Sequence, residues 1–377
     1  MLCRSDLAPL AHCALVLMGE GEVLDAGCRR PAAEALADRA LEPVELAEKE
    51  GLALINGTDG MLAQLVLALA DLELLLDTAD LAAALSVEGQ LGTDRTFAAD
   101  LMALRPQVGQ AISAANLRRF LAGSPIVASH RVGDGVVQDA YSLRCSPQVH
   151  GSVRDAVDFA VTIAERELAS AIDNPSVLPD GRVESHGNFH GAPIAHVLDF
   201  LAIGIADLAN LSERRTDRFL DANRSRGLSP FLADDPGIDS GLMIAQYTQA
   251  GICSKLKQLA TPASVDSIPS SALQEDHVSM GWNAARKLRV SVDGLARVLA
   301  IEILTAARGI DLRAPLRPGP ATGAAIADLR ERVPGPGPDR FLAPEIEAAY
   351  NLVRSGVLVA AAEPSGTGTS VHRRTER

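Results

Sequence analysis

The sequence predicts a mostly α-helical protein whose centre is a bundle of long helices. Alanine and leucine dominate the 377 residues, and over long stretches apolar side chains recur at spacings of three and four, the pattern of a helix with one buried face. The alternating pattern of half-buried strands is scarce. Four or more of the helical stretches run for about 20 residues, and a broad apolar face needs a partner, so these helices must pack together or against other subunits.

Four segments carry the bundle prediction. The segment from Met61 to Ser86 is apolar on nearly all sides and is expected to be a core helix. Pro193 suits the first turn of a later helix, whose apolar stripe ends in the charged Ser-Glu-Arg-Arg at 212–215. A further stripe runs from Leu288 to Ile303. The second of the four segments is also expected in the core, with a stripe made of Val153, Val157, Val161, Ala164, Leu168 and Ile172.

Loops rich in Gly, Asn, Asp, Ser and Pro separate these helices. A Pro/Gly stretch at 333–338 predicts a boundary before a last short helical region. Beyond it we expect a disordered tail over 363–377, since its Pro-Ser-Gly-Thr-Gly-Thr run has no apolar periodicity. The candidate functional loops are 128–148, 173–193, 223–240 and 262–281.

Composition excludes several classes of partner. The net charge is −13 and only 3% of residues are aromatic, so neither nucleic acid nor an anionic membrane surface is expected to bind. The five cysteines are scattered without a C-x-x-C pair, which favours reduced thiols in the cytoplasm. Polar residues interrupt Leu7–Met18, so no signal peptide is expected. The longest membrane candidate, Leu62–Leu75, is too short to span a bilayer. The sequence thus predicts a soluble cytoplasmic protein.

Two loops concentrate polar side chains. Gln138, Tyr141 and Arg144 lie within seven residues; arginine can clamp a carboxylate, and tyrosine beside a cation can act as acid or base. From spacing alone, an ordinary surface loop remains open. A second cluster, Gln274-Glu-Asp-His277, fits a site or simply the acidic first turn of a helix.

A third loop brings His186 and His190 near Glu184, superficially a metal pattern. The intervening Gly187-Asn188 would weaken any helix that placed both rings on one face, so we expect no metal. We interpret His186, His190 and His277 as structural.

Five motifs occur in one order along the chain. With Ser-Glu-Arg-Arg at 212–215 and Arg340-Phe-Leu-Ala-Pro344, they make the chain resemble the aromatic amino acid lyase family from about residue 3 to about residue 362. Asn-Phe-His and Gln-Glu-Asp-His are the forms of its histidine branch. The five are Ser5-Asp-Leu-Ala-Pro-Leu-Ala-His12, Gly51-Leu-Ala-Leu-Ile-Asn-Gly-Thr58, Gln138-Asp-Ala-Tyr-Ser-Leu-Arg-Cys145, Gly187-Asn-Phe-His190 and Gln274-Glu-Asp-His-Val-Ser-Met280.

The resemblance implies a fold and a reaction. The fold is a long central helical bundle of the aspartase/fumarase-like lyase type, assembled as a homotetramer, with residues 1–362 forming the C-terminal portion of the lyase domain. The reaction is the non-oxidative elimination of ammonia from L-histidine to give trans-urocanate. By the same resemblance, Asn56, Gln138 and Tyr141 surround the electrophile and the substrate amine. Arg144 and Asn174 hold the carboxylate, Phe189 packs beside the ring, and Glu275 addresses the imidazole.

The cofactor implied by the resemblance is a methylidene-imidazolone ring, which family members make from Ala-Ser-Gly or Cys-Ser-Gly; no metal is implied. This chain has Cys3-Arg4-Ser5 at that position. Arg4 has no hydroxyl to lose as water, and Ser5 replaces the flexible glycine whose nitrogen closes the ring. We therefore expect the ring not to form.

Relatives also carry well over a hundred residues before the tripeptide, including a catalytic tyrosine and a substrate-binding histidine, whereas two residues precede Cys3 here. The expectation is a chain that lacks the family's N-terminal domain and is inactive as it stands. Three hypotheses stay open: an enzyme with a misplaced start, a silent oligomerising subunit, and a lyase or aminomutase for another aromatic amino acid. Glu275 and His190 argue against the third; Leu273, where asparagine is common in relatives, weakens the histidine assignment slightly.

Overall fold

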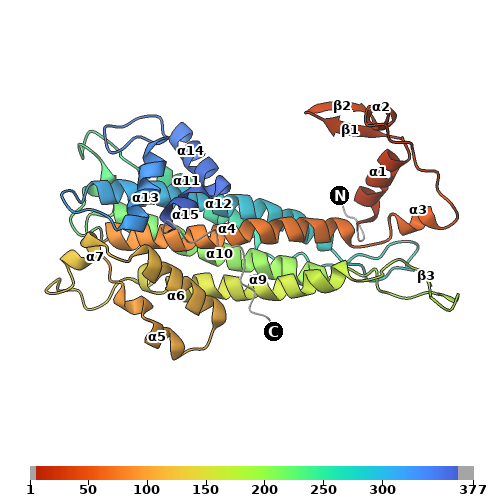
Figure 1. The fold of residues 1–377 in the computed structure, drawn as a ribbon, viewed down its shortest axis with the longest axis horizontal. Coiled ribbons are helices and arrows are strands. Elements are labelled where there is room, and N and C mark those ends of the chain that lie inside the picture. The colour runs from red at the N-terminus through yellow and green to blue at the C-terminus, as the bar shows by residue number, and fades with distance from the viewer. Residues whose placement is uncertain (1–5, 364–377) are drawn as a thin grey trace. The chain divides into compact units, whose positions relative to one another are not determined.

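The computed structural model describes residues 6–363, and these are mostly helical, as predicted (Figure 1). They divide into two compact units. The first unit comprises the described parts of Met1–Leu69, Phe159–Leu201 and Thr261–Arg289. The second comprises the described parts of Ala70–Asp158, Ala202–Ala260 and Val290–Arg377. Cys3-Arg4-Ser5 and residues 364–377 of the tail predicted over 363–377 lie outside the described residues. The first residue of that tail, Glu363, is described and forms an ion pair with Arg119.

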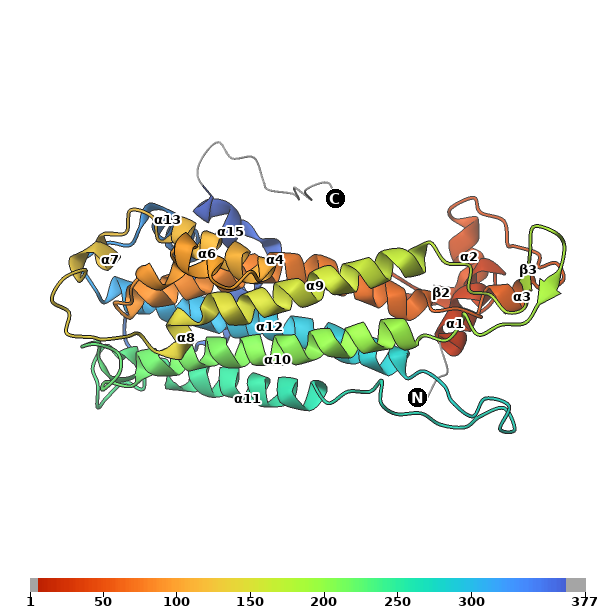
Figure 2. The ribbon, with the colours of Figure 1, turned by 90° about the horizontal axis from the view of Figure 1, so that it is seen from below.

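Four long helices contribute to both units, and they confirm the four predicted segments. In the second unit they lie side by side (Figures 1 and 2). The prediction of all-round burial is right for the later part of the first of them, where Leu81, Leu85 and their neighbours are fully buried. It is wrong for the earlier part, where Leu67 is exposed. The four are α4 (Asp59–Gly89), α9 (Ser146–Leu168), α10 (Ala192–Leu220) and α12 (Gly281–Asp311).

Two details of the predicted helices are wrong. The buried stripe of α9 consists of small residues, Val153, Ala156, Ala160 and Ala164, whereas Leu168 is exposed and Ile172 lies beyond the helix. The buried stripe of α10 does not end at the charged 212–215 segment but continues through Thr216 and Phe219, and the helix itself runs to Leu220. The reason is that Arg215 is buried in an ion pair, so a charged residue here faces the core.

The rest of the first unit surrounds the start of α4 and the loop after α9. Strands β1 (Glu22–Asp25) and β2 (Cys28–Pro31) form an antiparallel hairpin with Asp25 opposite Cys28. The two linking residues, Ala26 and Gly27, both have positive φ, as a type I′ turn requires. A second hairpin joins β3 (Ser176–Val177) to β4 (Val183–Glu184). The helices of this part are α1 (Leu7–Leu17), α2 (Ala32–Ala37) and α3 (Glu50–Ala53).

The second unit adds shorter helices to the four long ones. Helix α8 (Tyr141–Arg144) lies inside the segment predicted to be a loop. After the Pro/Gly stretch come α14 (Ala343–Ser355) and α15 (Val357–Ala362), the predicted last helical region. The others are η1 (Arg95–Phe97), α5 (Ala99–Ala103), α6 (Val108–Phe120), α7 (Pro125–Ser129), η2 (Pro230–Leu232), α11 (Met243–Leu259) and α13 (Pro320–Arg330).

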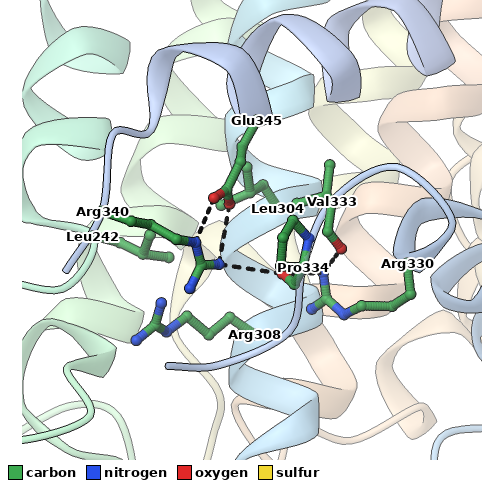
Figure 3. A pocket seen from close by; sticks show the side chains of 8 residues that line it. All are labelled: Leu242, Leu304, Arg308, Arg330, Val333, Pro334, Arg340 and Glu345. Carbon is green, nitrogen blue, oxygen red and sulfur yellow. Dashed lines mark hydrogen bonds and ion pairs between the residues drawn. The ribbon is translucent and has the colours of Figure 1, made fainter. Parts of the chain in front are cut away.

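Three arginines hold the Pro/Gly stretch in place (Figure 3). Arg308 Nη2 donates to Gly337 O at 2.8 Å, and Arg340 Nη2 donates to Gly335 O at 3.0 Å while pairing with Glu345. Arg330, paired with Asp311, lies beside the carbonyls of residues 333 and 334. The pocket between these side chains is about 10 Å³, room for about one water molecule, so it is too small for an amino acid.

One described helix is long and apolar enough to cross a membrane by length and composition. It is α10, not the Leu62–Leu75 segment singled out by the sequence. Within the protein, 61% of its most apolar window is buried. A mostly buried core helix passes the same test, so this feature is weak support for a membrane span.

Candidate active site

The predicted site residues fall into two groups. Gln138, Tyr141 and Arg144 belong to the second unit. The first unit holds Asn56, Asn174, Phe189 and Glu275.

In the second unit, Tyr141 and Arg144 are three residues apart on α8, so their side chains lie on the same face of this one-turn helix. The Arg144 guanidinium lies over the Tyr141 ring, 4.6 Å from its centroid. Its Nε is buried without a hydrogen-bond partner, and no carboxylate among residues 6–363 pairs with it. Tyr141 is 71% exposed. An arginine held against an aromatic ring and left unpaired is suited to bind a carboxylate from solution.

The position of α8 follows from a buried ion pair below it. Nη1 of Arg215, on α10, donates hydrogen bonds to Ser142 O at 3.2 Å and to Ser146 Oγ at 3.3 Å, so Arg215 fixes the turn that carries Tyr141. Its Nε and Nη2 donate to the two carboxylate oxygens of Glu302 on α12, at 2.5 and 2.8 Å. Both side chains are fully buried. Gln138 is exposed just before this turn.

In the first unit, the fold brings Asn56 and Asn174 into contact. Asn56 Nδ2 donates to Asn174 O at 2.9 Å and to Asp173 Oδ1 at 3.3 Å. Asn174 Oδ1 in turn accepts from the backbone N–H of His186 at 2.8 Å. Two predicted residues that lie far apart in sequence are therefore in contact, and we call Asn56 and Asn174 with their hydrogen bonds the asparagine corner.

Glu275 lies in the loop before α12 rather than in a first helical turn, because α12 begins only at Gly281. This corrects the helix-turn alternative. The loop is closed by a backbone bridge between Ser270 and Glu275, and the Glu275 carboxylate accepts from Ser270 Oγ at 3.1 Å. Phe189 is half-buried in the segment that precedes α10.

Two of the histidines interpreted as structural form a stacked pair. The rings of His190 and His277 have centroids 5.5 Å apart and planes 11° from parallel. His190 Nε2 is buried with no hydrogen-bond partner in the described structure. Among residues 6–363, no three His, Cys, Asp or Glu side chains gather closely enough to hold a metal ion.

Sequence reasoning missed Lys49 and Asp173, which form an ion pair beside the asparagine corner. Both line a pocket of about 380 Å³ in the first unit, together with Glu48, Glu50, Ala53, Ala171, Ile172, Ser176 and Val177. Asp173 is next to Asn174 in the sequence but belongs to none of the recognised motifs, and Lys49 lies over a hundred residues away. A pairing across that separation is set by the fold alone.

Asp6 is a second residue that the sequence did not single out. Its side chain is fully buried at the beginning of α4, where Oδ2 accepts from Met61 N at 2.5 Å. Burial raises the pKa of Asp6 to about 6, against the opposing effect of the backbone N–H groups of Met61 and Gly60. A helix N-terminus favours a carboxylate, but here desolvation is the larger effect.

The raised pKa of Asp6 predicts a pH-dependent stability. Between its ordinary pKa of 3.8 and its folded pKa of about 6, the folded state binds more protons than the unfolded state, so stability falls as pH rises through this window. The difference amounts to about 3 kcal/mol of unfolding free energy. Asp6→Asn should remove this fall, so denaturant titrations should show the variant gaining on the parent between pH 4 and 7. Exposed Asp100→Asn is the control, and a parallel pH profile for Asp6→Asn and parent would contradict the prediction.

Comparison with known proteins identifies the family of this chain. A family model described as aromatic amino acid lyase matches residues 3–331. The chain belongs to the aromatic amino acid lyase family. It is 63% identical, over 96% of its length and 71% of the relative's, to a histidine ammonia-lyase from Streptomyces griseus.

Solved structures of the aromatic amino acid lyase family share the fold. A histidine ammonia-lyase from Trypanosoma cruzi is 40% identical and superposes with a TM-score of 0.87, covering 96% of this chain and 70% of that one. A tyrosine aminomutase from Streptomyces globisporus is 37% identical with a TM-score of 0.89, covering 94% and 71%.

Members of the aromatic amino acid lyase family use a self-formed methylidene-imidazolone. The described part of the chain supplies neighbours for such a group, since Asp6 directly follows the tripeptide position and is anchored on α4. The tripeptide itself does not fit. Arg4 has no hydroxyl to eliminate, and Ser5 carries a side chain where the family has glycine.

Proposed function

We propose that this protein carries the histidine-directed site of a histidine ammonia-lyase, with L-histidine as its ligand and trans-urocanate as the product of the family reaction. The observation that carries the proposal is the unpaired Arg144 guanidinium held against Tyr141. The Arg144 guanidinium pairs with no carboxylate among the described residues. The Tyr141 ring and the contacts of Arg215 with α8 fix its position, so it is suited to bind the carboxylate of an amino acid.

The other residues take the roles that the family motifs assign. By the family resemblance, Arg144 in the second unit and Asn174 in the first are each assigned to a substrate carboxylate. Gln138 and Tyr141 in the second unit and Asn56 in the first are assigned to the amine, and Phe189 is assigned to the ring. Glu275 selects the imidazole, because a carboxylate discriminates a polar ring from an apolar one better than an apolar wall does. This is also the reason to rank a lyase or aminomutase for another aromatic amino acid second.

We further propose that the chain does not form the family electrophile. The support is chemical: Arg4 cannot supply the exocyclic methylene that dehydration of a serine gives. This favours a silent subunit of the histidine ammonia-lyase fold. Urocanate formed from L-histidine by the purified chain would contradict it.

Arg144→Ala tests the proposed ligand. If L-histidine or urocanate binds, the substitution should cost about 2–5 kcal/mol of binding free energy, the range for removing one side of a desolvated charge pair. Isothermal titration of parent and variant with urocanate measures this directly. Arg182→Ala, which removes an exposed arginine from the β3–β4 hairpin, is the control. Equal affinity of Arg144→Ala and parent would remove Arg144 from the site.

We also propose a cytoplasmic homotetramer. The described cysteines are free thiols, which suits a reducing compartment. The second unit leaves large apolar side chains exposed, including Leu104, Val108, Ile244 and Tyr247, as a surface covered by further subunits would. Sedimentation should therefore show a tetramer. A well-folded monomer at micromolar concentration would contradict the assembly.

A further inference from the structure

The two asparagines of the first unit are oriented in opposite senses. Asn56 uses its Nδ2 for both of its hydrogen bonds, to Asp173 Oδ1 and Asn174 O. Asn174 uses its Oδ1, which accepts from His186 N. Among the described residues no hydrogen bond engages Asn56 Oδ1 or Asn174 Nδ2. Asn56 therefore offers a carbonyl oxygen and Asn174 an NH₂ group.

His186 holds the backbone that orients Asn174. Its Nδ1 accepts from the backbone N–H of Asn188 at 3.0 Å, so the ring proton lies on Nε2. Nε2 then donates to Ser176 Oγ at 2.6 Å, and that hydroxyl donates to Asp173 O at 2.8 Å. One ring thus ties the segment at 186–188 to the residues around Asn174.

Lys49 and Asp173 orient Asn56 in the same way. The Lys49 ammonium pairs with Asp173 Oδ2, which leaves Oδ1 to accept from Asn56. The Asp173 carboxylate, which has no donor, can accept only from the Nδ2 end of Asn56. A reversed amide would place two oxygens against each other.

We propose that Lys49, Asp173 and His186 are positioning residues that set these two amides for a zwitterionic amino acid. Asn56 Oδ1 is the acceptor for the ammonium group and Asn174 Nδ2 is the donor for the carboxylate. The inference rests on the proposed function for the ligand class, and it adds residues to which the family motifs assign no role. His186, interpreted from the sequence as structural, becomes part of the carboxylate side of the site.

Two variants and three probes distinguish the ammonium side of the site, at Asn56, from its carboxylate side, at Asn174. L-histidine has both groups, histamine has only the amine, and urocanate has only the carboxylate. In isothermal titration of the full chain, Asp173→Ala should weaken L-histidine and histamine on the order of tenfold, about one hydrogen bond, and leave urocanate unchanged. His186→Ala should weaken L-histidine and urocanate to the same extent and spare histamine.

Matched variants control for a general effect on stability. Asp180→Ala, at the exposed tip of the β3–β4 hairpin, and His12→Ala, exposed on α1, should change no affinity. His186→Gln keeps one donor and one acceptor and should restore most of the urocanate affinity lost in His186→Ala. A uniform loss for all three probes, or no loss for any, would overturn the assignment.

Hydrogen exchange tests the network without any ligand. The N–H groups of residues 186 and 188 should exchange faster in His186→Ala than in Asp180→Ala, because the acceptor of the residue 188 N–H is removed and the tie that holds residue 186 beside Asn174 is lost. Asp173→Ala should leave both N–H groups unchanged, because among the described residues its side chain bonds only Lys49 and Asn56. Unchanged exchange in His186→Ala would overturn the inference. If the parent binds none of the probes while exchange accelerates as expected, the proposed ligand fails and the orientation of the amides stands.

Discussion

Glu302→Gln is expected to lower the free energy of unfolding by about 3–5 kcal/mol, the usual cost of leaving one member of a buried ion pair unpaired. Glu302 is fully buried and accepts from both Nε and Nη2 of Arg215. It also accepts from Ser86 Oγ at 2.7 Å and from Ser212 Oγ at 2.6 Å. The amide keeps the shape but loses the charge, so the Arg215 cation would remain in the core without its counterion.

Urea denaturation of parent and variant measures this loss. Glu184→Gln, which removes an exposed partner of Arg182, is the control and should change stability by less than about 1 kcal/mol. The double variant Arg215→Met, Glu302→Leu should be less destabilised than Glu302→Gln alone, since no charge is left unpaired. A loss below about 1 kcal/mol for Glu302→Gln would show that the pair is not desolvated as described.

The consequence for the site is specific to Tyr141 and Arg144. Since Arg215 donates to Ser142 O within α8 and to Ser146 Oγ at the start of α9, any variant that frees Arg215 should also loosen α8. Weaker binding of a carboxylate ligand in Glu302→Gln is therefore expected even though Glu302 touches no ligand.

The second large expected effect is that the unaltered chain does not convert L-histidine to urocanate. The proton taken in this elimination is weakly acidic and the amine is a poor leaving group, so side-chain bases alone are inadequate. Arg4 and Ser5 cannot make the electrophile that the family uses. Restoring Ser and Gly at these positions, in a chain joined to the upstream domain of a close relative, should produce urocanate.

The long helices were predictable because each depends on a local pattern. Apolar spacing located α4, α9, α10 and α12, but the buried face of α9 was misplaced because alanines, not the larger Leu168, pack against the neighbours. The end of the apolar stripe on α10 was misjudged because a distant contact, again, decides which residues are buried. A charged Arg215 signals a solvent-exposed turn unless its counterion, distant in sequence at Glu302, is known.

The site was predictable only where a motif carried it. Arg144 and Tyr141 are three residues apart, so their contact follows from one helical turn. The meeting of Asn56 with Asn174 was implied by resemblance alone, and the groups that orient them were not implied at all. Lys49 lies over a hundred residues before Asp173 and His186, which share the loop 173–193, and only the folded chain brings the three together around the two asparagines.

The absence of the electrophile is tested most directly with one preparation of the 377-residue chain, purified away from host lyase. The preparation is assayed with L-histidine by the ultraviolet absorbance of urocanate, and the intact mass of the chain is measured. We expect no urocanate and a mass equal to that of the unmodified sequence, because Arg4 has no hydroxyl to lose when Cys3-Arg4-Ser5 would have to cyclise. Urocanate formed at an ordinary enzymatic rate, with a mass lower by two waters, would contradict this expectation.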